Sequence, residues 1–401
     1  MKLFSKKDRS SSRPAQTVEL SEKNIIPRIA LLALLIVVAL FAFGYAINIW
    51  ISVEPGWQTV SDTSTSQNCG DDFTLLYNLG TGENSATAER RALIQLYNEL
   101  CETAYELFTA QEEVEDCYNI WYINRHPNEI IEVDTVLYEA FRTIEESGTR
   151  YLYLADAYSM YYSMFYSEND EEAAQYDPSK DEGMTEFYLE LAQYICDPEH
   201  ISVELLGDNQ IRLNVSEEYL AYAEENGVEM LIDFGWLKNA FIIDYLADSL
   251  IENGYVHGCL SSVEEYIRGL ETEAETEFSF TMYHRDGIVI SELSDIIYAG
   301  AVSCVYLHDY PLTDEDLTSR YYVYNDGEIR SLFIDPEDGC SKASVPELVA
   351  CSETLSCEET ALKAAGIFIA EEFDGEALAE MTRDGITAYY CEDGELVYTG
   401  E

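Results

Sequence analysis

Residues 231–255 place the strongest constraint on how the chain folds. The first residues are mostly apolar, and Gly235 follows them. Five residues then recur at intervals of four, three, four and three positions, as on one face of a helix: Trp236, Ala240, Ile243, Ala247 and Leu250. Asn253-Gly254 ends the pattern as a helix C-cap does. The stretch therefore predicts a buried strand, a tight turn and a helix whose first turn offers free N–H groups to an anion. Judged by the pattern alone, an ordinary core helix that follows a strand also accounts for residues 231–255.

The charge is unusual and unevenly placed. The chain has 401 residues, of which 47% are hydrophobic, so it can bury one large core or two ordinary ones. It carries 22 Lys and Arg against 77 Asp and Glu, a net charge of −55. Residues 1–54 hold 7 basic and 4 acidic residues, and the rest hold 15 basic and 73 acidic. Such a surface repels nucleic acid and anionic lipid. We predict a solvated acidic surface that keeps an exported protein soluble and monomeric, with no nucleic-acid partner.

Ten cysteines are spread along the sequence. They include no C-x-x-C pair and no companion His at zinc-site spacing, so the spacing does not predict zinc. An even number in an exported domain permits disulfides without giving their pairing, and buried thiols are the alternative.

Residues 29–53 predict a membrane span. This 25-residue run is apolar apart from Asn48 and Ser52, and about 20 residues suffice to cross a bilayer. Basic residues precede the run, and none follows until Arg90. The positive-inside rule then puts residues 1–28 in the cytoplasm and everything after Glu54 outside. A cleavable signal peptide is the alternative, but no clear small-x-small site follows. We expect an uncleaved signal anchor in a bacterial-type membrane.

The remaining patterns predict an α+β domain of antiparallel strands flanked by helices, over residues 72–401 after a linker at 54–71. The expected elements are a strand at 73–79, helices at 86–115, 134–146 and 217–225, a hairpin at 201–206 and 211–215, and hairpins turning near 286–287, 326–327 and 393–394. A run of tyrosines at 151–166 is interpreted as core packing, with an aromatic binding wall as the alternative.

Residues 233–244 resemble the central motif of the FAD:protein FMN transferase family, also called the thiamine-biosynthesis lipoprotein family. That motif reads Asp-Leu-Gly-Gly-Ile-Ala-Lys-Gly-Tyr and is followed by an Asp. The matching positions here are Asp233, Gly235, Leu237, Phe241 and Asp244. The second Gly, the Ala, the Lys and the last Gly are replaced by Trp236, Lys238, Asn239 and Ala240.

Further segments match the family in order over residues 72–401. Gly80-Thr81 matches the end of a Met-Gly-Thr strand, and Asn124 matches an Asn that follows it. Residues 333–339 resemble His-Ile-Ile-Asp-Pro-x-Thr-Gly, with Asp335, Pro336 and Gly339 retained. Residues 357–363 open a helix where the family has Ala-Asp-x-x-Ser-Thr-Ala.

The resemblance implies a flavin transferase fold and Mg²⁺-dependent transfer of FMN from FAD to a Thr of an acceptor, here an exported flavoprotein. It assigns cofactor binding to Gly80, Thr81, Asp233, Gly235, Asn239, Asp244, Asp335 and Gly339. It assigns the metal to the backbone carbonyl of Lys238 and to Glu358 or Glu359, whose Thr partner would be Leu362 or Lys363.

The departures from the motif predict a degenerate site. Trp236 fills space that a nucleotide needs, Asn239 removes a positive charge, and Leu362 offers no hydroxyl to a metal. The first hypothesis is a membrane-anchored, impaired flavin transferase. The alternatives are a non-catalytic cell-surface module that binds a ligand or docks a partner on the same fold, and a purely structural envelope protein.

Overall fold

The computed structural model describes residues 25–51, 53–82, 84–263, 266–271, 276–287, 289–313, 316–392 and 394–400. The chain divides into two compact units, Met1–Val53 and Glu54–Glu401. The first contains helix α1 (Ile25–Ile51), whose side chains at 29–42 are all exposed and apolar. Within the described residues, no helix meets the length and hydropathy that a membrane crossing requires.

The second unit is built on an eight-stranded antiparallel sheet with the order β1-β2-β6-β7-β10-β13-β14-β15. Its strands are β1 (Gly56–Val60), β2 (Phe73–Leu79), β6 (Gly258–Ser262), β7 (Tyr266–Gly269), β10 (Ser303–His308), β13 (Glu347–Ser352), β14 (Ile386–Glu392) and β15 (Glu395–Tyr398). Alternate residues of β2, beginning with Phe73, are buried, as expected for a strand with one covered face.

Three smaller groups of strands complete the β structure. A three-stranded sheet has the order β3-β5-β4, and β8-β9 and β11-β12 are separate hairpins. Their bounds are β3 (Ile130–Glu132), β4 (Ile201–Gly207), β5 (Gln210–Val215), β8 (Glu277–Asp286), β9 (Val289–Ala299), β11 (Tyr321–Val323) and β12 (Ile329–Ser331).

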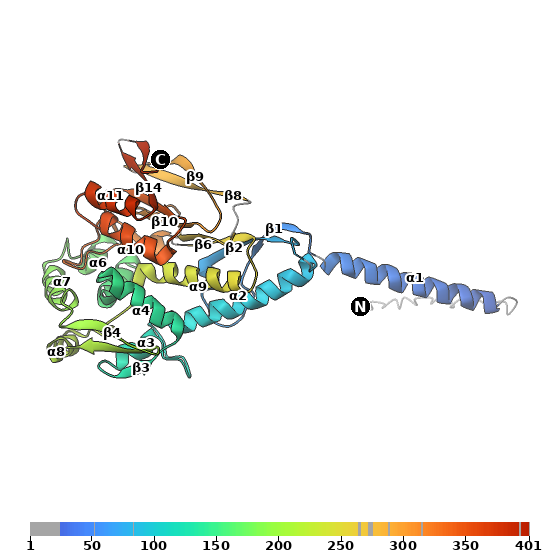
Figure 1. Ribbon diagram of the computed structural model, residues 1–401, viewed down its shortest axis with the longest axis horizontal. Helices are drawn as coiled ribbons and strands as arrows, with labels where there is room; N and C mark the ends of the chain where they lie inside the picture. The colour runs from blue at the N-terminus through green and yellow to red at the C-terminus, as the bar shows by residue number, and fades with distance from the viewer. Residues whose placement is uncertain are drawn as a thin grey trace, which may run out of the picture. The chain divides into compact units, whose positions relative to one another are not determined.

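Helices α2 (Ala86–Phe108), α9 (Lys238–Glu252) and α10 (Cys357–Phe368) pack together and against the main sheet (Figure 1). Cys304 and Tyr306 of β10 instead pack with the β8-β9 hairpin, so the hairpin covers the opposite face. The other helices are α3 (Ile120–Arg125), α4 (Thr135–Ser147), α5 (Ala155–Phe165), α6 (Asp170–Ala173), α7 (Glu182–Ile195), α8 (Glu217–Asn226) and α11 (Gly375–Arg383). The predicted α+β class is confirmed.

Three predicted elements differ from the structure. The helix expected at 86–115 ends at Phe108, where Thr109 leaves the helical conformation. The linker expected at 54–71 contains β1, which pairs with β2 along its whole length. Residues 231–234 form no strand, because the amide of Asn124 takes the place of a strand partner: its Oδ1 accepts from the N–H of Leu231 and Ile232, at 2.8 and 2.9 Å, and its Nδ2 donates to the carbonyl of Ile232.

Candidate functional site

Gly235 makes the turn into the helix that the sequence predicts. Its φ is +54°, a left-handed conformation that glycine adopts without strain. A Cβ at this position would overlap the ring of Tyr158, which is fully buried. A short 3₁₀ turn, Gly235–Leu237, then leads into α9. The backbone turn of the motif therefore requires glycine here for both conformation and space.

Asp233 lies just before this turn and is almost fully buried. Its N–H donates to the carbonyl of Leu152 at 2.9 Å, and its Oδ1 accepts from the N–H of Gly235 at 3.3 Å. Burial raises the pKa of Asp233, although Lys238 lowers it in part. The carboxyl group thus stabilises the turn from within the protein.

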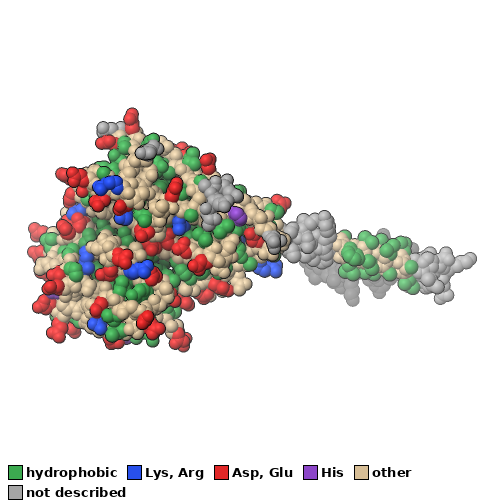
Figure 2. Space-filling model, viewed as in Figure 1, with side chains coloured by type: hydrophobic (Ala, Val, Ile, Leu, Met, Phe, Trp, Pro, Cys, Tyr) green, Lys and Arg blue, Asp and Glu red, His purple; other side chains and the backbone are tan. Residues whose placement is uncertain are grey.

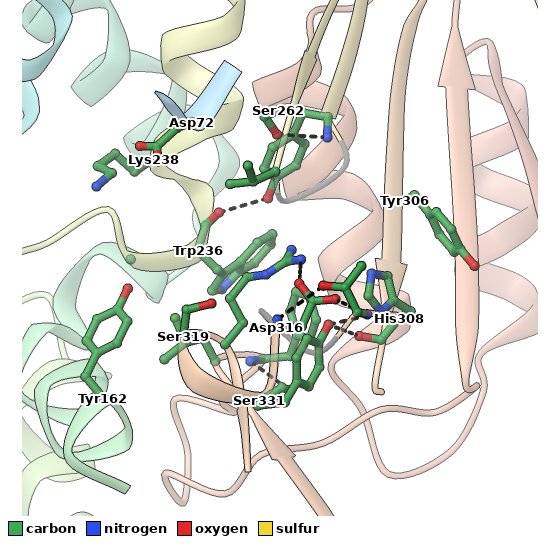
Figure 3. Close-up of a pocket in the computed structure, with 18 of the residues that line it drawn as sticks. Asp72, Tyr162, Trp236, Lys238, Ser262, Tyr306, His308, Asp316, Ser319 and Ser331 are labelled. Carbon is green, nitrogen blue, oxygen red and sulfur yellow. Dashed lines mark hydrogen bonds and ion pairs between the residues drawn. The ribbon is translucent and has the colours of Figure 1, made fainter. Parts of the chain in front are cut away.

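A cavity of about 620 Å³ opens beside the Gly235 turn. Figure 3 shows Trp236 near the centre of the lining residues, with Tyr162 of α5 on one side and His308 of β10 on the other. The aromatic members of the lining are Tyr162, Tyr166, Trp236, Tyr266, Tyr306, Tyr321 and Phe333. The volume and the aromatic part of the lining are both typical of a small-molecule site. Tyr162 and Tyr166 give the tyrosine run a part in the wall, whereas Tyr151, Tyr153, Tyr158 and Tyr161 are core residues.

Trp236 lines the cavity but is largely buried. Its ring lies edge-to-face with those of Phe333 and Tyr151, with centroids 5.3 and 5.6 Å apart. Its carbonyl accepts a hydrogen bond of 2.9 Å from the hydroxyl of Tyr266. The side chain is only 5% exposed, and its indole Nε1 has no hydrogen-bond partner within the described part of the chain. A buried N–H without a hydrogen-bond partner costs free energy.

Negative charge outweighs positive charge along the cavity lining. Asp71, Asp72 and Asp316 line it together with Lys238 and Arg320. Burial raises the pKa of Asp72, and nearby Lys238 lowers it in part. Asp316 pairs with Arg320 and accepts from the N–H of Leu312 and Thr313, so despite its burial its pKa is lowered. Arg320 is therefore paired with a carboxylate that shares the cavity with it, and Lys238 lies near the carboxylate of Asp72.

The predicted metal residues do not come together around one point on the cavity. Lys238 begins α9, so its carbonyl belongs to the hydrogen-bond pattern of the helix. Glu359 accepts from the N–H and hydroxyl of Ser356, both at 3.1 Å, and caps α10. Leu362 is buried and offers no oxygen.

Asp244, which is buried, and Glu358, which is half-buried, instead form an acidic pair. The Oδ2 of Asp244 accepts from the N–H of Glu358 at 2.9 Å, and its Oδ1 lies 3.3 Å from Nε of Arg268. Burial raises the pKa of Asp244 to about 7, although Arg268 lowers it, and burial also raises the pKa of Glu358. Arg268 already supplies a cation here. The residues present therefore do not fit an octahedral Mg²⁺, which needs several ionised or carbonyl oxygens.

The other predicted cofactor residues lie away from the cavity lining. Gly80 and Thr81 follow β2, whereas Asp71 and Asp72, which line the cavity, precede it. Asp335 pairs with Lys342 at 2.8 Å, and the carbonyl of Gly339 accepts from the hydroxyl of Tyr161 at 2.9 Å. Asn239 is buried in α9. Of all the predicted site residues, Gly235 and Lys238 line the cavity.

Much of the opposite wall was missed by sequence reasoning. Tyr306, His308, Asp316, Arg320 and Tyr321 come from β10 and the segment that follows it. No motif singled them out, and no local spacing relates them to Gly235. The positions at which this sequence departs from the family motif did not point to these residues either.

The domain is similar in structure to three solved proteins, each of which aligns with 86% of this chain. The ApbE protein of Thermotoga maritima has a TM-score of 0.59 at 13% identity, with 96% of that chain covered. The flavin transferase ApbE of Vibrio cholerae has a TM-score of 0.53 at 14% sequence identity, and 96% of that chain is covered. The flavinyl transferase ApbE of Pseudomonas stutzeri, in its apo form, has a TM-score of 0.52 at 11% sequence identity, and 95% of that chain is covered. No protein-family model and no curated protein sequence matches the chain. The resemblance inferred from the motifs is confirmed at the level of the fold: this chain has the fold of the ApbE flavin transferases.

Proposed function

We propose that the chain is a divergent flavin transferase-like protein that binds a flavin in the cavity beside Gly235. Its transfer of FMN from FAD to a Thr of an exported protein is impaired. The observation that carries the proposal is the aromatic cavity on an ApbE-type fold. An isoalloxazine ring is planar and aromatic, so it complements the aromatic lining.

The impairment follows from the charges. Transfer of FMN breaks a pyrophosphate, and the reaction needs cations that neutralise its developing charge. Arg320 is paired with Asp316, Lys238 lies near Asp72, and Arg268 is paired with Asp244 and Asp248. Loss of about 3 kcal/mol of transition-state stabilisation already lowers a rate about a hundredfold. We derive no step through Mg²⁺, because the donor set does not fit it.

The second candidate is a non-catalytic binding or docking module on the same fold. The carboxylates of Asp71, Asp72 and Asp316 in the cavity lining favour it, because they oppose a polyphosphate and accept a neutral or cationic aromatic ligand.

Titration of the full chain with riboflavin, FMN and FAD tests the binding proposal, with flavin fluorescence as the readout. We expect binding of riboflavin to be at least as tight as binding of FAD. Trp236→Gly should change the affinities, whereas Trp57→Gly, a control 41% exposed and outside the cavity lining, should leave them unchanged. Absence of binding for all three flavins would refute the proposal.

Flavin transfer is tested separately. The wild-type chain is mixed with FAD, Mg²⁺ and a Thr-bearing acceptor domain, and covalent flavin is followed by in-gel fluorescence. We expect little or no labelling. Labelling as strong as that by an active ApbE transferase run in parallel would overturn the impairment and restore an ordinary enzyme.

We further propose that residues 29–53 anchor the chain in a bacterial-type membrane, with residues after Glu54 outside the cytoplasm. The exposed apolar side chains of α1 support this, among them Leu40 and Phe41 at 66 and 76% exposure, because such a surface needs an apolar covering. Protease added to intact cells should degrade the second unit and spare residues 1–28. Protection of the second unit would contradict this orientation.

A further inference from the structure

Three potential metal ligands converge where the β8-β9 hairpin covers the main sheet. They are His284 on β8, Glu347 at the start of β13 and Cys391 near the end of β14. None of them lines the flavin cavity, and none belongs to a family motif. The three residues lie far apart in the sequence, so no local spacing reveals the group.

The side chains are already close to one another. One ligand atom from each lies within 4.8 Å of the others, and Nδ1 of His284 lies 2.7 Å from Oε1 of Glu347. Glu347 and Cys391 are 0 and 8% exposed, whereas the side chain of His284 is 23% exposed and leaves a way in.

Glu347 also carries an oxygen that its surroundings satisfy only in part. Its Oε2 accepts no hydrogen bond of good geometry within the described residues, although the nearby Tyr310 hydroxyl and Cys391 thiol partly offset the rise that burial causes in its pKa. A carboxylate oxygen buried in this way is costly unless a proton or a cation compensates it. This is an observation independent of the grouping itself, and it points to a ligand between the three side chains.

We propose that His284, Glu347 and Cys391 bind a divalent metal ion of the zinc class. Imidazole nitrogen, thiolate and carboxylate together suit Zn²⁺, whereas Mg²⁺ and Ca²⁺ require oxygen ligands. Tetrahedral bonds of about 2.0–2.3 Å place ligand atoms roughly 3.3–3.7 Å apart, which is within the observed span. Water fills the fourth position.

The charges balance when the ion binds. The thiol of Cys391 releases its proton to solvent. The Nδ1 proton that His284 donates to Glu347 is exchanged through solvent to Nε2, so the ring stays neutral and Nδ1 offers its lone pair to the ion. Thiolate and carboxylate then neutralise the two charges of the ion, so the buried site carries no net charge. The net charge of −55 also raises the local concentration of divalent cations around the protein.

The ion links the hairpin to the sheet. His284 belongs to β8, and the other two ligands belong to neighbouring strands of the main sheet, where Leu348 of β13 pairs with Tyr390 of β14. Met282 and Ile296 of the hairpin already pack on Tyr306 and Val349. The proposed ion adds a bond at the polar end of this apolar contact and so stabilises the hairpin's position.

Cobalt substitution tests the site without relying on activity. The full chain is freed of metal, then titrated with Co²⁺ and, in competition, with Zn²⁺. We expect one Co²⁺ per chain with a near-ultraviolet thiolate-to-cobalt band, displacement by Zn²⁺, and a rise in Tm on zinc binding. Cys391→Ser should abolish the band and weaken Zn²⁺ binding at least tenfold, and His284→Gln should weaken it similarly.

Control variants separate this site from adventitious binding. Cys117→Ser and His200→Gln remove one Cys and one His outside the group and should leave the band and the affinity unchanged. The metal-free Tm of each variant shows whether it folds. If wild type shows no thiolate band, or if folded Cys391→Ser binds Zn²⁺ as tightly as wild type, the proposal is wrong.

Discussion

At the scale of single residues, Gly235 and Gly366 make opposite demands. Gly235 has a φ of +54° and no room for a Cβ beside Tyr158, whereas Gly366 lies in α10 with open space around its Cβ position. We expect Gly235→Ala to lower the free energy of unfolding by more than about 2 kcal/mol. The strain of a left-handed backbone adds to the overlap between the new Cβ and the ring of Tyr158. Gly366→Ala should instead gain about 1 kcal/mol from helix propensity. Urea unfolding measures both, and equal effects would contradict this description of the turn.

The buried carboxyl group of Asp156 makes the stability of the protein depend on pH. Burial raises its pKa from 3.8 to about 6, and Glu229 adds to the effect. A carboxyl group whose folded pKa is raised contributes stability below pH 4, and that contribution is lost as the pH rises through 6. The effect of Asp156→Asn on the free energy of unfolding should therefore be more favourable at pH 7 than at pH 4, by about 1–3 kcal/mol.

Urea unfolding of Asp156→Asn at the two pH values checks this sign. The exposed turn residue Asp208 provides the control, since Asp208→Asn should change stability equally at both. A loss of stability in Asp156→Asn at pH 7 would show that the carboxylate is stabilised by its surroundings rather than penalised.

At the scale of elements, sequence reasoning succeeded where the pattern is local. The apolar spacing from Trp236 to Leu250 predicted α9, and Asn253-Gly254 predicted its end. It failed for residues 231–234, because their partner is the Asn124 side chain, more than 100 residues away in the sequence. The same limit hid His308 and Arg320 from the site prediction, since only the folded sheet brings them to Trp236.

The assignment of Glu359 to a metal competes with a local role that the structure shows. Ser356 and Glu359 form a capping box at the start of α10, in which each side chain satisfies the other residue's backbone N–H. Glu359→Ala should lower the free energy of unfolding by about 0.5–1 kcal/mol. Glu359→Gln should keep most of the stability, because a Gln side chain also completes the capping box.

Thermal unfolding with and without Mg²⁺ distinguishes the two roles. Glu353→Ala, an exposed control before the helix, should have little effect. If Mg²⁺ stabilises the wild type and Glu359→Gln abolishes that stabilisation, Glu359 is a metal ligand and the capping interpretation is insufficient.

At the scale of the whole molecule, the dominant property is repulsion between like charges. The net charge is −55, and Figure 2 shows Asp and Glu scattered over the visible face with few Lys or Arg among them. Ion pairs such as Lys342 with Asp335 and Asp338 neutralise only a small part of this charge. Such self-repulsion destabilises a compact state while it keeps the protein soluble.

Salt should therefore stabilise the protein. Raising the ionic strength from about 0.01 to 0.15 M shortens the screening length from about 30 to 8 Å, which weakens repulsion across the surface more than the close or buried ion pairs. Each kcal/mol of repulsion removed should raise Tm by about 2–4 °C or slightly less for a domain of this size. Differential scanning calorimetry in NaCl and in KCl, with a chelator present to exclude divalent ions, measures the shift. Sucrose at equal osmolarity controls for non-electrostatic effects. A Tm that falls with added NaCl and KCl would show that attractive pairs, and not repulsion, dominate the electrostatics of the folded chain.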